Sequence, residues 1–279
     1  MNTNKFRYYI LIFILSIIST QLYAKNKSIP SGNIDNQTCI ECHEKINPQL
    51  INDWKNSIHA RTQPVIDCVS CHGSLHKKIA AHARPDKTCI ECHGGDKSPA
   101  VHSYTSSKHG IIMRLEKNTY DWQQPLAQAN YRAPGCSYCH MHDSNHNINS
   151  LSRASLMDKK AADNNETSIR SVCQDCHAPR YITRLLVNGE NMLEIARKKV
   201  REGNGLIEQA SALFSESELK PARQLMEKMQ HHLKNVYLGV AHQSPDYQWW
   251  HGHPALDGDL LNIKGSISEL HRNKVNHKP

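Results

Sequence analysis

Cys136-Ser137-Tyr138-Cys139-His140 lies near the middle of the 279-residue chain and has the spacing C-x-x-C-H. Two cysteines at this spacing sit on one side of a tight turn, where their thiols can add to the two vinyl groups of a haem. The histidine that follows can then point its imidazole at the iron. The same spacing occurs at Cys39-Cys42-His43, Cys68-Cys71-His72, Cys89-Cys92-His93 and Cys173-Cys176-His177. These five motifs use all ten cysteines, so the sequence predicts five covalently bound haem c groups.

Two other uses of cysteine pairs compete with haem attachment. A zinc site takes C-x-x-C pairs two at a time, but five is an odd number, and zinc needs no histidine directly after each pair. A disulfide framework accepts ten cysteines but leaves the five histidines unexplained. Haem attachment accounts for both residue types, and we prefer it for that reason.

Side chains that usually form a protein core are scarce in this chain. Hydrophobic residues make up 38% of it, aromatic residues 6%, and phenylalanine occurs three times. A chain of this composition would be marginally stable by itself. Porphyrins are large, flat and apolar, and could replace much of the missing core. We therefore expect that the protein without haem does not fold.

The formal net charge of +8 does not indicate a nucleic-acid partner. Haem propionates would offset most of this charge, so that the protein with its haems is close to neutral. Basic and aromatic residues also fail to alternate as they do in many proteins that bind single-stranded nucleic acid. The sequence therefore predicts no nucleic-acid binding.

The first 24 residues have the pattern of a secretory signal peptide. Lys5 and Arg7 precede an apolar run, residues 10–18, and Leu22-Tyr23-Ala24 provides a cleavage site. The apolar run is too short to span a bilayer comfortably. Because c-type haem is attached outside the cytoplasm in bacteria, the predicted location is the periplasm.

The motifs predict a mostly α-helical fold with much irregular structure. A haem-cored multihaem cytochrome c domain is expected over residues 25–180, and a C-terminal helical domain packed on it over residues 181–279. In the second region cysteines are absent and apolar residues recur with helical period. The rhythm is sustained longest over residues 222–240, after a predicted capping box at Ser215 and Glu218. Gly203-Asn204-Gly205 is expected to break the helix before it.

Fourteen of the 19 histidines lie outside the five motifs, enough to give every iron a second axial ligand. His59 ends a short predicted helix after the first motif and is well placed to ligate a neighbouring iron. Between the second and third motifs we favour His76 over His82, because His76 follows His72 by four residues.

Further ligand candidates come from two later segments. A helix predicted from Pro99 to about His109, ended by Gly110, would place His102 and His109 on one face. Both could ligate different haems. In the aromatic segment near the C-terminus, His242, His251 or His253 could reach a haem.

The segment from Ser98 to His146 resembles the hydroxylamine oxidoreductase family of multihaem cytochromes. The residues that carry this resemblance are Ser106-Ser107-Lys108-His109-Gly110, Tyr131 to Met141, and Asn145-His146-Asn147-Ile148. The segment from Ala241 to Gly252 is similar to the terminal helical segment of that family. The motif Cys139-His140-Met141 with a downstream histidine, and the long C-terminal helices, also resemble the pentahaem cytochrome c nitrite reductases.

The resemblance implies that His109 and His146 are axial ligands. The chain departs from both families in three respects. The oxidoreductases typically have eight haems where this chain has five motifs, and the nitrite reductases replace the proximal histidine of the catalytic haem with lysine, whereas all five motifs here end in histidine. The chain is also much shorter than the members of either family. No catalytic residue is carried over.

Two functions fit these observations. The first is electron transfer through a row of closely spaced haems with two axial histidines each. The second is an oxidoreductase in which one haem lacks its distal ligand and acts on hydroxylamine, nitrite or sulfite, with His142, Asp143 or Tyr247 as a proton donor. Redox proteins of the periplasm are the expected partners, and the long C-terminal helix could pair with a second copy of the chain.

Overall fold

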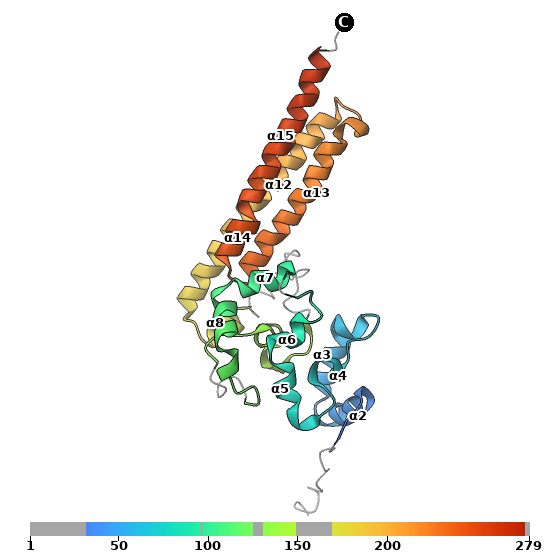
Figure 1. Cartoon of the computed structure of the whole chain (residues 1–279), viewed down its shortest axis with the longest axis vertical. Helices are drawn as coiled ribbons and strands as arrows, with labels where there is room; N and C mark the ends of the chain where they lie inside the picture. The colour runs from blue at the N-terminus through green and yellow to red at the C-terminus, as the bar shows by residue number, and fades with distance from the viewer. Residues whose placement is uncertain (1–31, 96, 125–130, 149–168, 277–279) are drawn as a thin grey trace, which may run out of the picture.

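The computed structural model describes residues 32–95, 97–124, 131–148 and 169–276, and the predicted signal peptide lies outside them. Two parts are visible in Figure 1. An N-terminal unit, residues 32–178 as far as they are described, consists of short helices and irregular connections. A rod of long helices projects from it and carries the C-terminus at its far end.

The N-terminal unit contains short α-helices and 3-10 turns and, in its described residues, no strand beyond an isolated bridge between Asn33 and Leu75. The elements are α2 (Asn36–Ile46), α3 (Pro48–Asn56), η1 (His59–Arg61), α4 (Cys68–His72), η2 (His76–Lys78), α5 (Ile79–Ala83), α6 (Asp86–Ile90), α7 (Pro99–Thr105), α8 (Lys108–Glu116), η3 (Lys117–Thr119), α9 (Cys136–His140) and η5 (His142–Ser144). The predicted fold class, mostly helical with much irregular structure and long helices at the C-terminus, is confirmed.

The rod is a three-helix bundle of α12 (Pro179–Ser211), α13 (Glu216–Ala241) and α15 (His253–Asn276), with the short helix α14 (Pro245–His251) at its base. Apolar side chains recur on one face of each long helix, and the three faces meet in one core. This core is made by Leu193, Ala196, Val200, Ile207, Ala210, Phe214, Leu219, Ala222, Met226, Met229, Leu233, Val236, Tyr237, Leu256, Leu260, Ile263 and Ile267. None of the described helices is long and apolar enough to cross a membrane.

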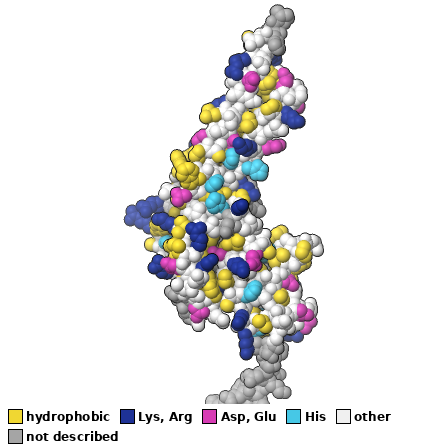
Figure 2. Space-filling view, viewed as in Figure 1, with side chains coloured by type: hydrophobic (Ala, Val, Ile, Leu, Met, Phe, Trp, Pro, Cys, Tyr) yellow, Lys and Arg dark blue, Asp and Glu magenta, His cyan; other side chains and the backbone are white. Residues whose placement is uncertain are grey.

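The N-terminal unit lacks a comparable core. Its buried apolar side chains in the described residues are few and scattered: Ile51, Val101, Met113, Tyr120, Ala133 and Val172. Large apolar side chains such as Leu75 and Leu115 are instead 50% and 74% exposed. Apolar side chains are accordingly spread over the surface of this unit in Figure 2. The unit therefore has the composition of a fold that needs an apolar partner other than its own side chains.

The start of α13 agrees with the sequence prediction, whereas the length of α12 does not. Ser215 and Glu218 form the predicted capping box, with the Ser215 backbone N–H donating to the Glu218 carboxylate at 2.8 Å. The predicted break at Gly203-Asn204-Gly205 is wrong, because α12 continues through it and is longer than α13. Gly203 is buried against the sulfur atoms of Met226 and Met229, so packing outweighs the weak helix propensity of glycine.

The helix predicted from Pro99 to His109 is two helices. The Ser107 side chain accepts a hydrogen bond from the Gly110 backbone N–H and begins α8 as its N-cap, so the chain turns between α7 and α8. Gly110 lies inside α8 rather than at its end, pressed against the Tyr104 carbonyl oxygen, where no Cβ would fit. His102 and His109 consequently do not share a helix face.

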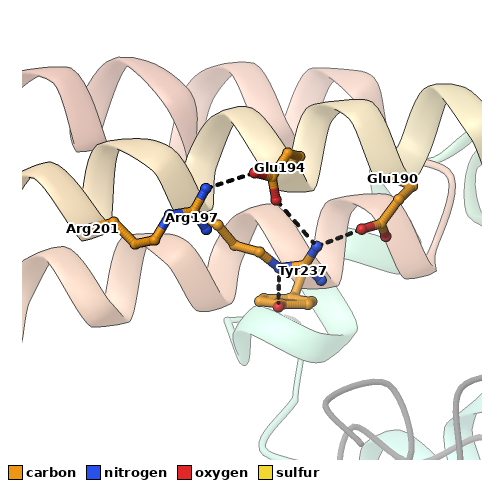
Figure 3. A network of polar contacts seen from close by, with 5 residues as sticks. All are labelled: Glu190, Glu194, Arg197, Arg201 and Tyr237. Carbon is orange, nitrogen blue, oxygen red and sulfur yellow. Dashed lines mark hydrogen bonds and ion pairs between the residues drawn. The ribbon is translucent and has the colours of Figure 1, made fainter. Parts of the chain in front are cut away.

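A polar network ties α12 to α13 along one side of the bundle (Figure 3). The Arg197 guanidinium donates to the Tyr237 hydroxyl at 2.9 Å and to the Glu190 carboxylate at 2.5 Å. Arg201 donates to Glu194 at 2.6 Å, one helical turn further on. Because these charges are partly exposed, they contribute little stability, and the network chiefly fixes how the two helices lie against each other.

Candidate haem-binding sites

The five C-x-x-C-H motifs lie on short helical turns. Two of them coincide with whole helices, α4 and α9. The first cysteine of each motif begins or lies within a helical turn, so the second cysteine projects from the same side as the first. This local geometry is the one that thioether attachment of a haem requires.

Aspartates start the first two of these turns. The Asp35 carboxylate accepts a hydrogen bond from the Thr38 backbone N–H, and Asp67 accepts one from Ser70 N–H, each at 2.8 Å. The hydrogen bonds to Thr38 lower the pKa of Asp35, so this cap is charged at neutral pH. The motif turns are therefore specified locally, by an N-cap placed directly before the helix.

The competing uses of the cysteines find no support in the described residues. None of the ten cysteines forms a disulfide, and no cluster of three or more His, Cys, Asp or Glu side chains could hold a metal ion in the part of the chain that is described. Burial raises the pKa of the Cys68 thiol to about 11 and that of Cys139 to about 12.

Four motif histidines face a second histidine from elsewhere in the chain. Their ring centroids lie 6.4 Å apart for His43 and His76, 6.1 Å for His93 and His59, 6.0 Å for His72 and His146, and 6.0 Å for His177 and His109. No hydrogen bond or ion pair joins the partners within a pair. The same kind of group bound between the two rings of each pair would explain why four separate pairs have nearly the same spacing.

This spacing fits one iron held between two imidazoles. Metal–nitrogen bonds to histidine are about 2 Å long, and each ring centroid lies about 1 Å behind its nitrogen, so two opposed rings should be about 6 Å apart. The observed separations of 6.0 to 6.4 Å agree with that value. The fit rests on the protein's own atoms and does not depend on the cysteine motif.

The fifth motif histidine, His140, lies near His242. Burial and, after it, the nearness of His140 lower the pKa of His242 to about 4. Its ring is held by Ser103, whose Oγ lies 2.7 Å from His242 Nδ1. Tyr104 packs edge-on against the same imidazole, with ring centroids 6.1 Å apart.

Several of these imidazoles have the protonation state that a metal ligand requires. Nδ1 of His146 lies 2.7 Å from the Ser144 carbonyl oxygen, and Nδ1 of His72 lies 3.4 Å from that of Ile79. A carbonyl oxygen only accepts, so Nδ1 carries the proton and Nε2 keeps its free electron pair. Burial lowers the pKa of His59, His72, His109 and His140, which keeps these rings neutral as ligation requires.

The other candidate histidines have different surroundings. His82 Nδ1 lies 2.9 Å from the Cys71 carbonyl oxygen. His102 packs against His251 and Tyr247, with ring centroids 5.0 Å and 5.4 Å away. His253 Nε2 is buried without a hydrogen-bond partner. No ring contact with a motif histidine is found for any of these in the described residues.

The proposed proton donors are also occupied. His142 Nε2 and the Tyr138 hydroxyl both bind the Asp175 carboxylate, at 2.8 Å and 2.5 Å. This contact links the fourth motif to the fifth, since Tyr138 and Asp175 lie inside those motifs. Tyr247 is buried and its hydroxyl contacts Asn235 at 3.3 Å. His142 and Tyr247 therefore have structural roles, and the third candidate, Asp143, lies beside His142, with its carboxylate 3.3 Å from His142 Nδ1.

Consecutive motifs are also joined through their helix starts. The Cys68 backbone N–H donates to the Asn36 side-chain oxygen at 3.1 Å, and Cys136 N–H donates to the Asp86 carboxylate at 2.7 Å. Asn36 and Asp86 each lie three residues before the first cysteine of their own motif. The first motif therefore docks on the second as the third docks on the fourth.

An internal repeat underlies this equivalence. Thr-Cys-Ile-Glu-Cys-His occurs at residues 38–43 and again, 50 residues later, at 88–93. His59 and His109 each follow the first cysteine of their repeat by 20 residues. Buried side chains repeat too, because Ile51 and Val101 are 2% and 8% exposed. This repeat was readable from the sequence, and it would have identified His59 and His109 as equivalent residues.

Exposed apolar side chains adjoin three of the paired histidines, His59, His76 and His177. Ile58 and Leu75, which are 51% and 50% exposed, directly precede His59 and His76. The Tyr181 ring lies 5.0 Å from that of His177 and is 45% exposed. An apolar group bound between the paired rings would cover such side chains, so the lining also fits a porphyrin.

Comparisons with known proteins agree with these features. The chain is similar to a probable nitrite reductase–hydroxylamine oxidoreductase fusion protein of Kuenenia stuttgartiensis, with 23% identity over 75% of this chain. That match covers 37% of the relative, so the chain spans little more than a third of its length.

Two solved structures align with most of this chain. A hypothetical multihaem protein aligns over 75% of this chain and 59% of its own, with a TM-score of 0.56 and 16% identity. A reducing HAO-like protein complex of Kuenenia stuttgartiensis aligns over 88% of this chain and 89% of its own, with a TM-score of 0.49 and 16% identity.

A family model described as "seven times multi-haem cytochrome CxxCH" matches residues 59–220, which is more than half of the chain and includes its second to fifth motifs. The first motif lies outside the match but shares its hexapeptide with the third. The chain therefore belongs to the multihaem cytochrome family, in which C-x-x-C-H motifs bind haem c covalently.

Proposed function

We propose that this protein is a pentahaem electron carrier in which each iron is held between two histidines. Bound haem c supplies one-electron exchange between ferric and ferrous iron. The chain supplies two thioether anchors and two imidazoles at each site. The observation that carries the proposal is the 6.0 to 6.4 Å separation of four independent histidine pairs.

The ligand assignment follows from the pairs. The first cysteine pair, Cys39 and Cys42, would anchor the haem between His43 and His76. The remaining sites would be Cys68 and Cys71 with His72 and His146, Cys89 and Cys92 with His93 and His59, Cys136 and Cys139 with His140 and His242, and Cys173 and Cys176 with His177 and His109.

The sites would form a row in chain order. Thiols of consecutive motifs lie next to each other. The Cys39 thiol lies near that of Cys68, Cys71 lies near Cys89 and Cys92, Cys89 lies near Cys136, and Cys139 lies near Cys173 and Cys176. Neighbouring attachment points keep neighbouring porphyrins close, which is what rapid electron transfer along a row requires.

Electron transfer explains the geometry better than catalysis at an open iron. An enzyme acting on hydroxylamine, nitrite or sulfite needs one iron without a distal ligand. In the described residues, each of the five motif histidines has a second histidine close to it. The Kuenenia relative is named as a probable nitrite reductase–hydroxylamine oxidoreductase fusion, but this chain covers only 37% of that protein.

Periplasmic location and redox protein partners belong to the same proposal. They are supported by the signal-peptide pattern of residues 1–24 and by the requirement for haem attachment outside the cytoplasm. Pairing of two copies through the C-terminal helices stays a prediction.

The test combines intact mass with electron paramagnetic resonance of the fully oxidised, haem-loaded protein. Five added haem groups and only low-spin ferric signals, unchanged by nitrite or hydroxylamine, are expected. A high-spin signal that shifts when either molecule is added would contradict the proposal and favour the enzyme. A mass with fewer than five haems would show that one motif is not used.

A further inference from the structure

A group of buried serines joins α7 to the turn between α13 and α14. Ser103, Ser107 and Ser244 are 0%, 1% and 0% exposed. Serine is mostly found at protein surfaces, and a buried hydroxyl destabilises the fold unless it has hydrogen-bond partners. The cluster lies where the N-terminal unit meets the base of the bundle (Figure 1).

Ser103 makes two hydrogen bonds with different roles. Its hydroxyl donates to the Ala100 carbonyl oxygen at 2.9 Å, within α7. Its Oγ also lies 2.7 Å from His242 Nδ1. The hydroxyl has one hydrogen, which the Ala100 carbonyl takes, so Oγ accepts the second hydrogen bond from His242 Nδ1–H.

This arrangement leaves His242 Nε2 unprotonated, as an axial ligand must be. It also fixes the direction of the ring, because the hydrogen bond holds Nδ1 against α7. Ser103 and His242 lie 139 residues apart in the chain. The contact therefore connects an imidazole of the C-terminal helices to the N-terminal unit.

His242 differs from the other proposed distal ligands in the kind of partner that it has. The Nδ1 atom of His146 faces a backbone carbonyl oxygen of its own turn, two residues away. Of the five, His242 is the one whose ring hydrogen bonds a side chain in the described residues. A side-chain partner can be removed by substitution, which a backbone carbonyl cannot.

We propose that Ser103 is a positioning residue for His242, and that it sets the strength of the distal bond at the fourth haem and lowers the reduction potential of that haem. The proposal rests on the proposed ligation of the fourth haem by His140 and His242. A hydrogen bond accepted from Nδ1–H makes the imidazole more basic, and a more basic ligand stabilises ferric over ferrous iron.

The test compares Ser103→Ala with Ser106→Ala in the haem-loaded protein. Ser106 lies three residues further along, as the C-cap of α7. Its Oγ contacts Ser244 Oγ at 3.1 Å, the His102 carbonyl oxygen at 2.7 Å and the Ser103 carbonyl oxygen at 3.4 Å. The Ser106 hydroxyl makes no hydrogen bond to His242, so Ser106→Ala disturbs the same junction without removing the imidazole's partner. Ser103→Thr retains the hydroxyl and serves as the rescue variant.

Spectroelectrochemical titration and low-spin electron paramagnetic resonance provide the readouts. In Ser103→Ala, one of the five midpoint potentials should rise and the low-spin signal of one haem should change, while the other four stay as in the wild type. Ser106→Ala and Ser103→Thr should resemble the wild type. Five unchanged potentials in Ser103→Ala, or an equal rise in Ser106→Ala, would overturn the proposal.

Loss of haem from Ser103→Ala is detected by intact mass, and Ser103→Cys then provides the measurement, because a thiol is a weaker acceptor of similar size. A smaller rise of one potential supports the proposal, and no rise overturns it. Failure of this inference can be distinguished from failure of the proposed function. A high-spin haem in the wild type contradicts the ligation by paired histidines, whereas an all-low-spin wild type with no effect of Ser103 contradicts only this inference.

Discussion

Substitution of His76 tests the pairing of histidines most directly. The ring of His76 lies 6.4 Å from that of His43 and belongs to η2, one short turn after the second motif. His76→Ala removes one of the two proposed ligands from one iron and leaves the other four sites intact. The variant should therefore contain one high-spin ferric haem in five, and its reduced form should bind one carbon monoxide per chain.

The matched control is His82→Ala. His82 is six residues further along and is also near the second motif, since its Nδ1 lies 2.9 Å from the Cys71 carbonyl oxygen. Losing this exposed hydrogen bond should lower the free energy of unfolding by about 1 kcal/mol or less. Because no motif histidine faces His82, all haems in this variant should stay low-spin and bind no carbon monoxide.

The assay is spin quantitation of the oxidised protein, followed by carbon monoxide titration of the reduced protein at a known haem content. Wild type and His82→Ala should give no binding, and His76→Ala should saturate at one equivalent. An entirely low-spin His76→Ala, or an opened site in His82→Ala, would refute the assignment of His76 and with it the argument from ring spacing.

Three further predictions concern stability. Produced without haem attachment, the chain should retain the helices of its bundle but not an ordered N-terminal unit, because the described apolar core lies entirely in the bundle. Circular dichroism with limited proteolysis tests this, and an N-terminal unit fully protected from the protease would contradict it. His232→Ala should lower the free energy of unfolding by about 3 kcal/mol, because it leaves the buried Asp259 carboxylate without its nearest partner, His232 Nδ1 at 2.5 Å. The control is His231→Ala, which changes the exposed neighbouring residue, and equal losses of stability in the two variants would contradict this role. Gly205→Ala should raise the free energy of unfolding by about 0.5 to 1 kcal/mol, because the new Cβ would meet open space. In Gly203→Ala the methyl group would lie 3.3 Å from two methionine sulfur atoms, so thermal melts should show a smaller gain in stability or a loss.

Local features of the sequence predicted much of this architecture. The long helices follow from apolar residues at helical spacing, and the Ser215–Glu218 capping box was readable because its two residues contact each other within one turn. The motif turns were readable for the same reason, since the two cysteines and the histidine act within five residues. Each of these features depends on neighbours in the chain.

The predictions that failed depended on distant contacts. Gly203-Asn204-Gly205 has the composition of a break, but Gly203 packs on Met226 and Met229 from another helix. The turn between α7 and α8 was missed because the serine at Ser107 was taken as helix interior rather than as an N-cap. Propensity is a weak guide where burial between helices contributes several times more free energy than one residue's preference.

The pairing of the histidines could not have been read locally, because the partners cross between the two repeats. His59 belongs to the first repeat and faces His93 of the second, while His109 of the second repeat faces His177 of the fifth motif. In each repeat, the histidine that follows the first cysteine by 20 residues faces a histidine of a later motif, from the first motif to the third and from the third to the fifth. In return, His146, after the second repeat, faces His72 of the first. If each facing pair holds one iron, the second motif needs His146 from beyond the fourth motif, and the third motif needs His59 from the first repeat. The N-terminal unit would then fold around its haems as one body rather than as a series of separable two-haem modules.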